Sequence, residues 1–420
     1  MSSIHITLSF LFLFIFNLQD LFAAPTRHLC RPEQRDALLE FKNEFKIRKP
    51  SFHDCYINGS YVNVSSYPKT ESWKNNSDCC YWDGVKCHAK SGEVIELDLS
   101  CSCLHGRLHS NSSLFRLQNF PSLTTLHLSQ NHLSGQIPSI IENLSNLTSL
   151  DLSANQFFGQ IPFSLGNISH LTSLSLSGNQ FSGQIPSSLG NLSYLTSLQL
   201  SGNQFSGQIP SSIGNLSHLA YLFLSYNSFV GEIPSSFGSL NQLTRLFVDS
   251  NKLSGNFPIL LLNLTKLSFL SLSSNQFTGT LPPNITSLSN LEYFFADGNS
   301  FVGSLPSSLF TIPSLTTIYL GNNNLNGTLE FGNISSPSQL QALGLGKNNF
   351  RGPIPRSISK LVNLETLDLS HWNTQGPVDF TIFSHLKSIQ ILTLAHLNTT
   401  STIDLNAILS CFKSLVALAL

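Results

Sequence analysis

Leucines and polar residues alternate along most of this chain in a pattern that repeats at a fixed interval. From residue 94 onward, short segments such as Leu150-Asp-Leu152 place two leucines on one face of an extended strand. An Asn follows three residues after the second leucine, and it recurs at steps of 24 residues. The pattern predicts short parallel strands stacked in about 13 turns, with the chain ending at Leu420 inside a fourteenth.

The in-phase asparagines form one structural set. Trp372 and Leu397 stand in their place in later turns, and Ser102 in the first, longer turn. An amide here can satisfy backbone groups where the chain leaves the strand, so we expect a structural ladder and not an active site. The set is Asn131, Asn155, Asn179, Asn203, Asn227, Asn251, Asn275, Asn299, Asn323 and, after a step of 25, Asn348.

A Phe two residues after the Asn recurs in many turns, and Gly-x-Ile-Pro often follows it. We expect the rings to stack as a spine inside the coil, while the proline prevents long helices on a flat back wall. This spacing is that of the leucine-rich repeat, an α/β repeat class. The spine residues are Phe157, Phe181, Phe205, Phe229, Phe277, Phe301 and Phe350.

The segments before the repeats divide into a leader and a cap. Residues 8–16 form an apolar run too short to span a bilayer, which takes about 20 residues. Residues 1–24 therefore predict a secretory signal peptide. Residues 25–93 predict a cap over the first turn of a solenoid spanning 94–420. Within the cap we expect a helix over 32–45 with Leu38, Phe41 and Phe45 on one face, and a polar loop over 50–72.

Cysteines and glycosylation sequons agree with export. We expect disulfides Cys30–Cys79 and Cys80–Cys87, because two vicinal cysteines rarely pair with each other. The pairing of Cys55, Cys101, Cys103 and Cys411 stays open. Fourteen Asn-x-Ser/Thr sequons predict glycosylation, and five of them share one repeat position on the wall opposite the strands. They are Asn58, Asn63, Asn75, Asn111, Asn143, Asn146, Asn167, Asn191, Asn215, Asn263, Asn284, Asn326, Asn333 and Asn398.

Composition excludes some classes of function. Charged residues make up 11% of the chain and the net charge is -1, so binding of nucleic acid through bulk positive charge is excluded. The low charge follows from repeating one template of Leu, Ser, Asn, Gly and Phe. No later stretch reaches 18 apolar residues, so the sequence predicts no membrane anchor within this chain.

Three segments of the sequence allow it to be compared with a known family. They are Leu38-Leu39-Glu40-Phe41-Lys42, the segment from Trp73 to Cys87, and repeats reading Leu-Ser-Gly-Asn-Gln-Phe-Ser-Gly-Gln-Ile-Pro. Residues 30–420 resemble the ectodomain of plant leucine-rich-repeat receptor-like proteins, the kinase-lacking relatives of receptor kinases. The segments 369–380 and 403–411 look particular to that group. The resemblance implies a right-handed solenoid of the plant-specific 24-residue type with a disulfide-stabilised cap.

The resemblance also implies a location and partners. Such receptors bind a peptide, protein or microbial ligand at the extracellular side of the plasma membrane and signal with a receptor kinase. They continue into more repeats, a C-terminal cap and a membrane helix, so we expect this chain to be a fragment or a truncated form. A complete chain of this length would be secreted.

The candidate ligand surface lies where strand residues point away from the leucines. Early turns place small polar residues there, whereas turns near 221–319 place aromatic residues with a few charges. A contiguous exposed apolar patch usually marks a binding surface; the alternative is that aromatics simply form strands well. The candidates are Tyr221, Phe223, Tyr226, Arg245, Phe247, Asp249, Phe269, Tyr293, Phe295, Asp297 and Tyr319.

Signals of catalysis are weak, so we expect no enzyme, no cofactor and no bound metal. Cys101-x-Cys103-x-His105 with His109 resembles a metal cluster, but disulfide pairing fits an exported chain better. Two functions therefore stand. The first is a recognition module of a receptor in defence or development. The alternative is a secreted inhibitor of cell-wall-degrading enzymes, since the cap and repeats also resemble polygalacturonase-inhibiting proteins.

Overall fold

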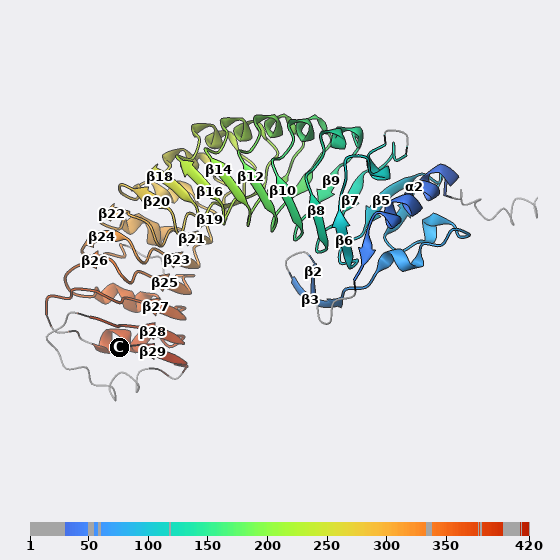
Figure 1. Cartoon of the computed structure of the whole chain (residues 1–420). Coiled ribbons are helices and arrows are strands. Elements are labelled where there is room, and N and C mark those ends of the chain that lie inside the picture. Colours follow the sequence, from blue (N-terminus) through green and yellow to red (C-terminus); the bar gives the residue numbers. More distant parts are fainter. Residues whose placement is uncertain are drawn as a thin grey trace, which may run out of the picture.

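The chain forms a curved solenoid that begins in a small cap (Figure 1). The computed structural model describes residues 30–48, 54–57, 60–116, 119–332, 338–376, 378, 380–397, 412 and 414–419. The signal-peptide prediction at 1–24 therefore lies outside the described residues. Among the described residues, no helix is long and apolar enough to cross a bilayer.

A 15-stranded sheet runs the length of the solenoid and lines the inner side of the arc (Figure 1). Its strands are parallel except β4, which pairs antiparallel with β5. Strands β5 to β28 are the 13 expected turns, and β29 begins a fourteenth. In sheet order the strands are β4 (Val85–Cys87), β5 (Val94–Asp98), β7 (Thr125–His127), β9 (Ser149–Asp151), β11 (Ser173–Ser175), β13 (Ser197–Gln199), β15 (Tyr221–Phe223), β17 (Arg245–Phe247), β19 (Phe269–Ser271), β21 (Tyr293–Phe295), β23 (Thr317–Tyr319), β25 (Ala342–Gly344), β27 (Thr366–Asp368), β28 (Ile391–Thr393) and β29 (Ala417–Ala419).

A second strand follows the Asn of most turns, and these strands form two further sheets, which the sequence did not lead us to expect. The first contains β1 (Lys46–Ile47), β6 (Leu104–Arg107), β8 (His132–Gly135), β10 (Gln156–Gly159), β12 (Gln180–Gly183), β14 (Gln204–Gly207), β16 (Ser228–Gly231), β18 (Lys252–Asn256) and β20 (Gln276–Thr278). The second contains β22 (Val302–Gly303), β24 (Asn324–Gly327) and β26 (Asn349–Phe350).

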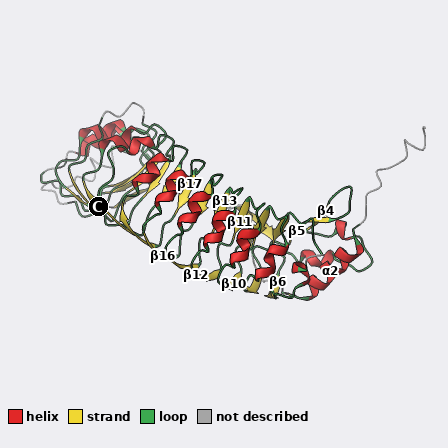
Figure 2. Ribbon diagram, turned by 90° about the horizontal axis from the view of Figure 1, so that it is seen from above, coloured by secondary structure: helices red, strands yellow, loops and turns green. Residues whose placement is uncertain are grey.

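Single turns of 3-10 helix cover the outer side of the arc, as Figure 2 shows from above. They begin just after the repeat proline, which agrees with the expectation that this residue prevents longer helices. The solenoid helices are η3 (Ser113–Phe115), η4 (Ser139–Asn143), η5 (Phe163–Asn167), η6 (Ser187–Asn191), η7 (Ser211–Asn215), η8 (Ser235–Ser239), η9 (Ile259–Asn263), η10 (Ile285–Ser287), η11 (Ser307–Thr311), η12 (Arg356–Lys360) and η13 (Phe380–His385).

Close stacking of these helical turns explains a repeat glycine. A Cβ added at Gly190 would lie 2.4 Å from the carbonyl oxygen of Ser212 in the following turn. Gly166 faces the same obstacle at 2.3 Å from Ser188. A larger residue would therefore force neighbouring turns apart.

The Asn ladder is confirmed in detail. The side-chain oxygen of Asn179 accepts a hydrogen bond from the backbone N–H of Phe157 at 2.9 Å, in the turn before it. Its amide nitrogen donates to the carbonyls of Leu152, Leu176 and Ser177 at 3.0–3.3 Å. Each Asn thus closes its own turn and ties it to the preceding one, which leaves few buried backbone groups unsatisfied.

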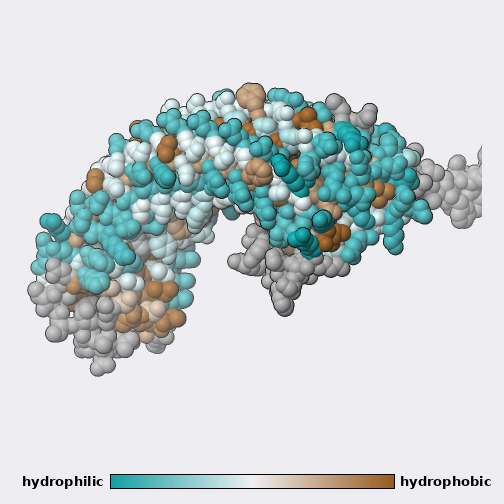
Figure 3. Space-filling view, in the orientation of Figure 1, coloured by the Kyte–Doolittle hydropathy of each residue, from teal (hydrophilic) through white to brown (hydrophobic). Residues whose placement is uncertain are grey.

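The Phe spine is also confirmed. Phe157, Phe181, Phe205 and Phe229 are fully buried and stack with centroids 6.2–6.3 Å apart. Trp372, which replaces an Asn, joins the spine: its ring stacks on Phe350 at 5.2 Å and its N–H donates to the carbonyl of Gly352. The buried side chains of the interior are mostly apolar. Hydrophilic and neutral residues dominate the flank that Figure 3 shows.

The cap contains α2 (Pro32–Asn43), which buries Leu38 and Phe41 against the first turn. Our helix prediction was two residues too long. The chain turns after Asn43 because Lys46–Ile47 pairs antiparallel with β6. Phe45 still packs into the core at 8% exposure. A stacked pair, Trp73 and Trp82, completes the cap with η1 (Lys69–Ser72) and η2 (Cys79–Tyr81).

The polar loop expected over 50–72 is wrong. The structure has an antiparallel hairpin of β2 (Asp54–Ile57) and β3 (Ser60–Ser65) there. The sequence of β3 contains Tyr61, Val62 and Val64, residue types that are enriched in strands. The loop over 50–72 was expected from its polarity, and that measure missed the strand pattern.

The disulfides Cys30–Cys79 and Cys80–Cys87 are present as expected. A third bond, Cys55–Cys101, ties the hairpin to the first turn of the solenoid. Cys103 is a buried free thiol. Cys411 lies outside the described residues.

Candidate ligand-binding surface

The inner face of the solenoid carries parallel rows of side chains, because strands of equal register place equivalent residues side by side. One row contains Phe223, Phe247, Ser271, Phe295 and Tyr319. The row two residues earlier on the same strands is Tyr221, Arg245, Phe269, Tyr293 and Thr317. Leu222 and Leu246 between the rows are fully buried, so both rows face outward.

Five aromatic residues on this face stack continuously across strands β15 to β23. We call Phe223, Phe247, Phe269, Phe295 and Tyr319 the aromatic ladder. Their successive ring centroids lie 4.8, 4.3, 5.2 and 5.5 Å apart, all in stacked geometry. The ladder bridges rows at its middle, because Phe269 belongs to the neighbouring row and stacks on both Phe247 and Phe295.

The aromatic ladder remains partly open to solvent. Its rings are half-buried, whereas Tyr221 and Tyr293 beside it are 40% and 36% exposed. Tyr293 stacks on Phe269 at 5.0 Å, and Arg245 lies over the ring of Tyr221 at 5.8 Å. Tyr226 is set apart in the turn after β15, with a left-handed backbone and 66% exposure. The structure therefore joins the expected aromatics, except Tyr226, into one surface.

Carboxylates flank the aromatic ladder along the edge where the strands end. Asp249 accepts a 2.6 Å hydrogen bond from the hydroxyl of Ser225, and Asp297 accepts one of equal length from Ser273. Each serine lies in the turn before its aspartate. These bonds hold both half-buried carboxylates in fixed positions beside the rings.

The aromatic ladder ends where two side chains converge over glycines. Tyr319 leans over Gly344, at which a Cβ would lie 2.4 Å from the tyrosine ring. Asp368 leans from the opposite side over Gly346, at which a Cβ would lie 2.5 Å from both carboxylate oxygens. Burial first, and then Asp297 and Asp368, raise the pKa of Tyr319, because each disfavours the phenolate. Asp368 lies in the same row as Phe223 and Tyr319, but it is not among the sequence candidates because the aromatic run stops at Tyr319.

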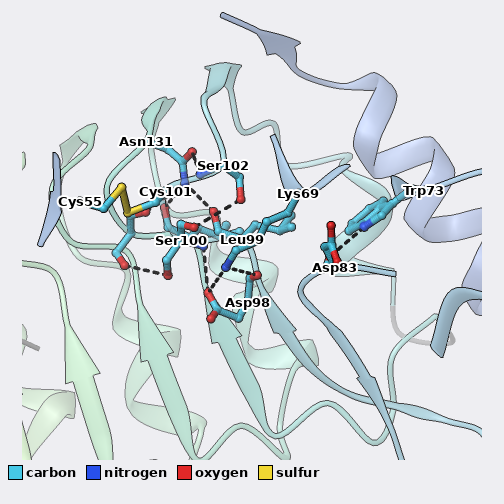
Figure 4. Close-up of polar contacts among 12 residues, drawn as sticks. Cys55, Lys69, Trp73, Asp83, Asp98, Leu99, Ser100, Cys101, Ser102 and Asn131 are labelled. Carbon is cyan, nitrogen blue, oxygen red and sulfur yellow. Dashed lines mark hydrogen bonds and ion pairs between the residues drawn. A yellow bond between two sulfur atoms is a disulfide. The ribbon is translucent and has the colours of Figure 1, made fainter. Parts of the chain in front are cut away.

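The first turns carry a different, polar surface. Lys69 forms an ion pair with Asp98 at 3.4 Å, shown in Figure 4 beside the Cys55–Cys101 bond. Burial works against charge on Asp98, but the hydrogen bonds from Ser100 and the nearby Lys69 together lower its pKa. Carboxylates at the start of the solenoid are thus neutralised within the chain.

The possible metal cluster does not assemble as a set of ligands. The sulfur of Cys101 is bonded to Cys55, and His105 stacks on His132 at 4.2 Å. Cys30, Cys79 and Cys80 lie close to Asp78, but all three sulfurs are in disulfides. A disulfide sulfur is not a thiolate, so Cys101 and the three sulfurs beside Asp78 are not available as metal ligands.

The repeated sequons lie on the outer side of the arc. Asn167, Asn191, Asn215 and Asn263 are exposed at the ends of 3-10 helices. Asn143 is half-buried and donates to the carbonyl of Phe115. Asn58, Asn333 and Asn398 lie outside the described residues, as does the side chain of Asn63. Glycosylation at the sequons stays a prediction.

Comparison with known families agrees with this architecture. A leucine-rich repeat region model matches residues 187–420, and a leucine rich repeat N-terminal domain model matches 31–54 and 61–88. Two smaller repeat models match 121–166 and 170–192. The chain belongs to the leucine-rich-repeat family.

Similar sequences show which leucine-rich-repeat proteins this chain resembles. Receptor-like protein 35 of Arabidopsis thaliana is 67% identical over 139 residues, which are 33% of this chain and 14% of that protein. Receptor-like protein 33 of the same plant is 64% identical over 141 residues, 34% of this chain and 15% of that protein. The match thus spans about a seventh of each relative's length. The expected resemblance to plant receptor-like proteins is confirmed.

Solved structures show the same solenoid. The Arabidopsis receptor kinase HAESA ectodomain, in complex with an extended IDA peptide hormone, superposes with a TM-score of 0.75 at 32% identity, covering 92% of this chain and 61% of that one. The peptide hormone receptor RGFR1 in complex with RGF2 gives 0.63 at 31% identity, covering 75% and 57%. Both neighbours carry a peptide ligand on a solenoid of this kind.

Proposed function

We propose that this chain is the extracellular recognition module of a cell-surface receptor-like protein, and that it binds a peptide or microbial ligand on the aromatic ladder. The observation that carries the proposal is the continuous stack from Phe223 to Tyr319 on the inner face. Aromatic rings that are half open to solvent, with fixed carboxylates beside them, combine apolar contact area with polar specificity.

The neighbours support this proposal. HAESA and RGFR1 are receptors solved in complex with peptides, and the similar sequences are receptor-like proteins. By the same likeness, signalling would require a receptor kinase partner, and the module would lie on the extracellular side of the plasma membrane. The alternative, a secreted inhibitor of cell-wall-degrading enzymes, has less support because the similar sequences are receptor-like proteins.

Removal of two rings tests the proposal. The variant Phe223→Ala with Phe247→Ala should keep the fold, because neither side chain belongs to the interior. Its capture of peptides from a synthetic octapeptide library should fall about tenfold or more against the wild type, since central aromatic anchors cost about 2 kcal/mol or more when truncated. The matched control is Ser173→Ala with Ser197→Ala, in neighbouring strands of the same sheet.

The outcomes separate the alternatives. Equal capture by the double-alanine variant and the wild type would show that the aromatic ladder binds nothing. A loss of capture in the serine control as well would indicate a general defect of the sheet. An inhibitor function would instead appear as binding of a purified polygalacturonase, measured in the same assay.

A further inference from the structure

The carboxylates beside the aromatic ladder have no basic partner among the described residues. Within the described part of the chain, the ion pairs all involve residues between 31 and 116. Asp249, Asp297 and Asp368 therefore have no Lys, Arg or His nitrogen at salt-bridge distance. Their hydrogen-bond partners are a serine hydroxyl or a backbone N–H, which leave the negative charge in place.

Aspartates at one strand position differ in whether a basic residue pairs with them. Asp98 and Asp368 occupy equivalent strand positions, and the backbone N–H of the serine two residues later donates to each, at 2.9 and 2.8 Å. Lys69 neutralises Asp98. None of the residues that the structure describes does so for Asp368.

The end of the aromatic ladder has the shape and charge for a cation. The ring of Tyr319 and the carboxylate of Asp368 approach the turn containing Gly344 and Gly346 from opposite sides. Asp297 adds a second carboxylate close enough to affect the Tyr319 phenol. An aromatic face together with carboxylates favours a guanidinium or ammonium group, because both attract positive charge.

We propose that the ligand of the aromatic ladder is a peptide with a basic side chain, and that this side chain binds between Tyr319, Asp297 and Asp368. The inference rests on the proposed function, since it assumes that the aromatic ladder holds the ligand. Arg245 lies near Tyr221, at the end of the aromatic ladder away from Tyr319 and on its opposite edge. The surface therefore has positive charge at one end and negative charge at the other, which would orient the peptide.

The test uses the full chain, immobilised, and a library of random octapeptides with blocked termini. Arg and Lys should be enriched in the captured pool. Replacing Arg by citrulline, its uncharged analogue, in the most enriched peptides should weaken wild-type binding about tenfold, as expected for contacts with two carboxylates and one ring. The variant Asp297→Asn with Asp368→Asn should lose most of this preference for Arg over citrulline, because only the ring of Tyr319 then attracts the charge.

Asp151→Asn is the matched control. Asp151 occupies the same strand position as Asp368 and has the same backbone hydrogen bond, from Ser153, but lies three turns before the aromatic ladder. This variant should keep the full preference for Arg. Unfolding midpoints of all variants should agree, which excludes loss of fold.

Three results would overturn the inference, and one of them would also overturn the proposed function. If captured peptides lack basic residues, or if the double-asparagine variant keeps the Arg preference, the cation subsite is wrong while the aromatic ladder still binds peptide. If Phe223→Ala with Phe247→Ala captures the same pool as the wild type, the proposed function fails as well.

Discussion

Phe247 stacks on Phe269 with ring centroids 4.3 Å apart although the two residues hold different positions on their strands. The residue in register with Phe247 is Ser271, which is small and only 5% exposed. The large ring of Phe269 therefore lies over it from the neighbouring row. This crossing keeps the aromatic ladder continuous where the row itself is interrupted.

Truncation of Phe269 and of an interior phenylalanine should have very different effects. Phe269→Ala should cost about 1.5 kcal/mol or less of unfolding free energy, because its ring is half open to solvent. Phe205→Ala should cost about 3–5 kcal/mol, because it leaves a cavity in the fully buried spine. Chemical denaturation monitored by circular dichroism measures both. Similar losses for the two variants would contradict the division into surface and core aromatics.

The Asn ladder should contribute strongly to the stability of the fold, although its side chains are polar. Asn179→Ala removes the acceptor for the N–H of Phe157 and leaves that group buried. We expect a loss of about 2 kcal/mol or more. Amide hydrogen exchange should become faster than in the wild type in the turn of Asn179 and in the turn before it. The exposed neighbour Gln180→Ala is the control and should leave both measurements unchanged.

The cysteines offer a direct check of the cap. A peptide that links Cys55 to Cys101 should appear in a non-reducing digest, together with those linking Cys30 to Cys79 and Cys80 to Cys87. Cys103 is 5% exposed, so iodoacetamide should label it only after denaturation. Mass spectrometry measures both the linked peptides and the labelling of Cys103. A peptide that joins Cys55 to Cys103 would show that the first turn is stapled differently.

Stability at the junction of cap and solenoid should fall with acidification. Burial, and then His132 and Arg48, hold the pKa of His105 below its ordinary value. The unfolded chain therefore takes up a proton near pH 6.5 that the folded chain resists. The stabilisation is complete above that pH and is lost as pH falls toward the folded pKa.

His105→Gln should remove this part of the pH dependence. Unfolding midpoints at pH 7.5 and 5.5 should differ less in the variant than in the wild type. His170→Gln, an exposed histidine in a middle turn, should retain the wild-type difference. An identical pH dependence in all three proteins would rule out a role for His105.

The periodic part of the fold could be predicted from the sequence because its determinants are local. Leu150 and Leu152 define a strand face, and Asn155 recurs with the same hydrogen bonds as its neighbours. The Cys55–Cys101 bond could not be predicted, because it joins segments 46 residues apart. The hairpin of β2 and β3 was missed for a different reason, since its polar composition favoured a loop.

The candidate surface was predictable to a similar degree. Alternation placed Phe223 and Phe247 on the inner face, but it could not show that Phe269 would cross between rows. Asp368 was missed because its importance comes from a glycine turn that lets it lean toward Tyr319. The approach of these two side chains depends on their directions, and the periodicity of the sequence does not determine those directions.

Each ladder asparagine bonds only to its own turn and the one before it, so the molecule can change length in whole turns. A gene duplication or deletion of one whole turn would restore every one of these bonds, because each asparagine would meet an equivalent neighbouring turn. The step of 25 residues to Asn348 keeps the same bonds, so the turn also accepts one extra residue. Length variants among close homologues should therefore differ by multiples of one repeat. Such events would move the ligand footprint along the arc as a unit, and this gives evolution a simple way to reposition a binding surface without redesigning it.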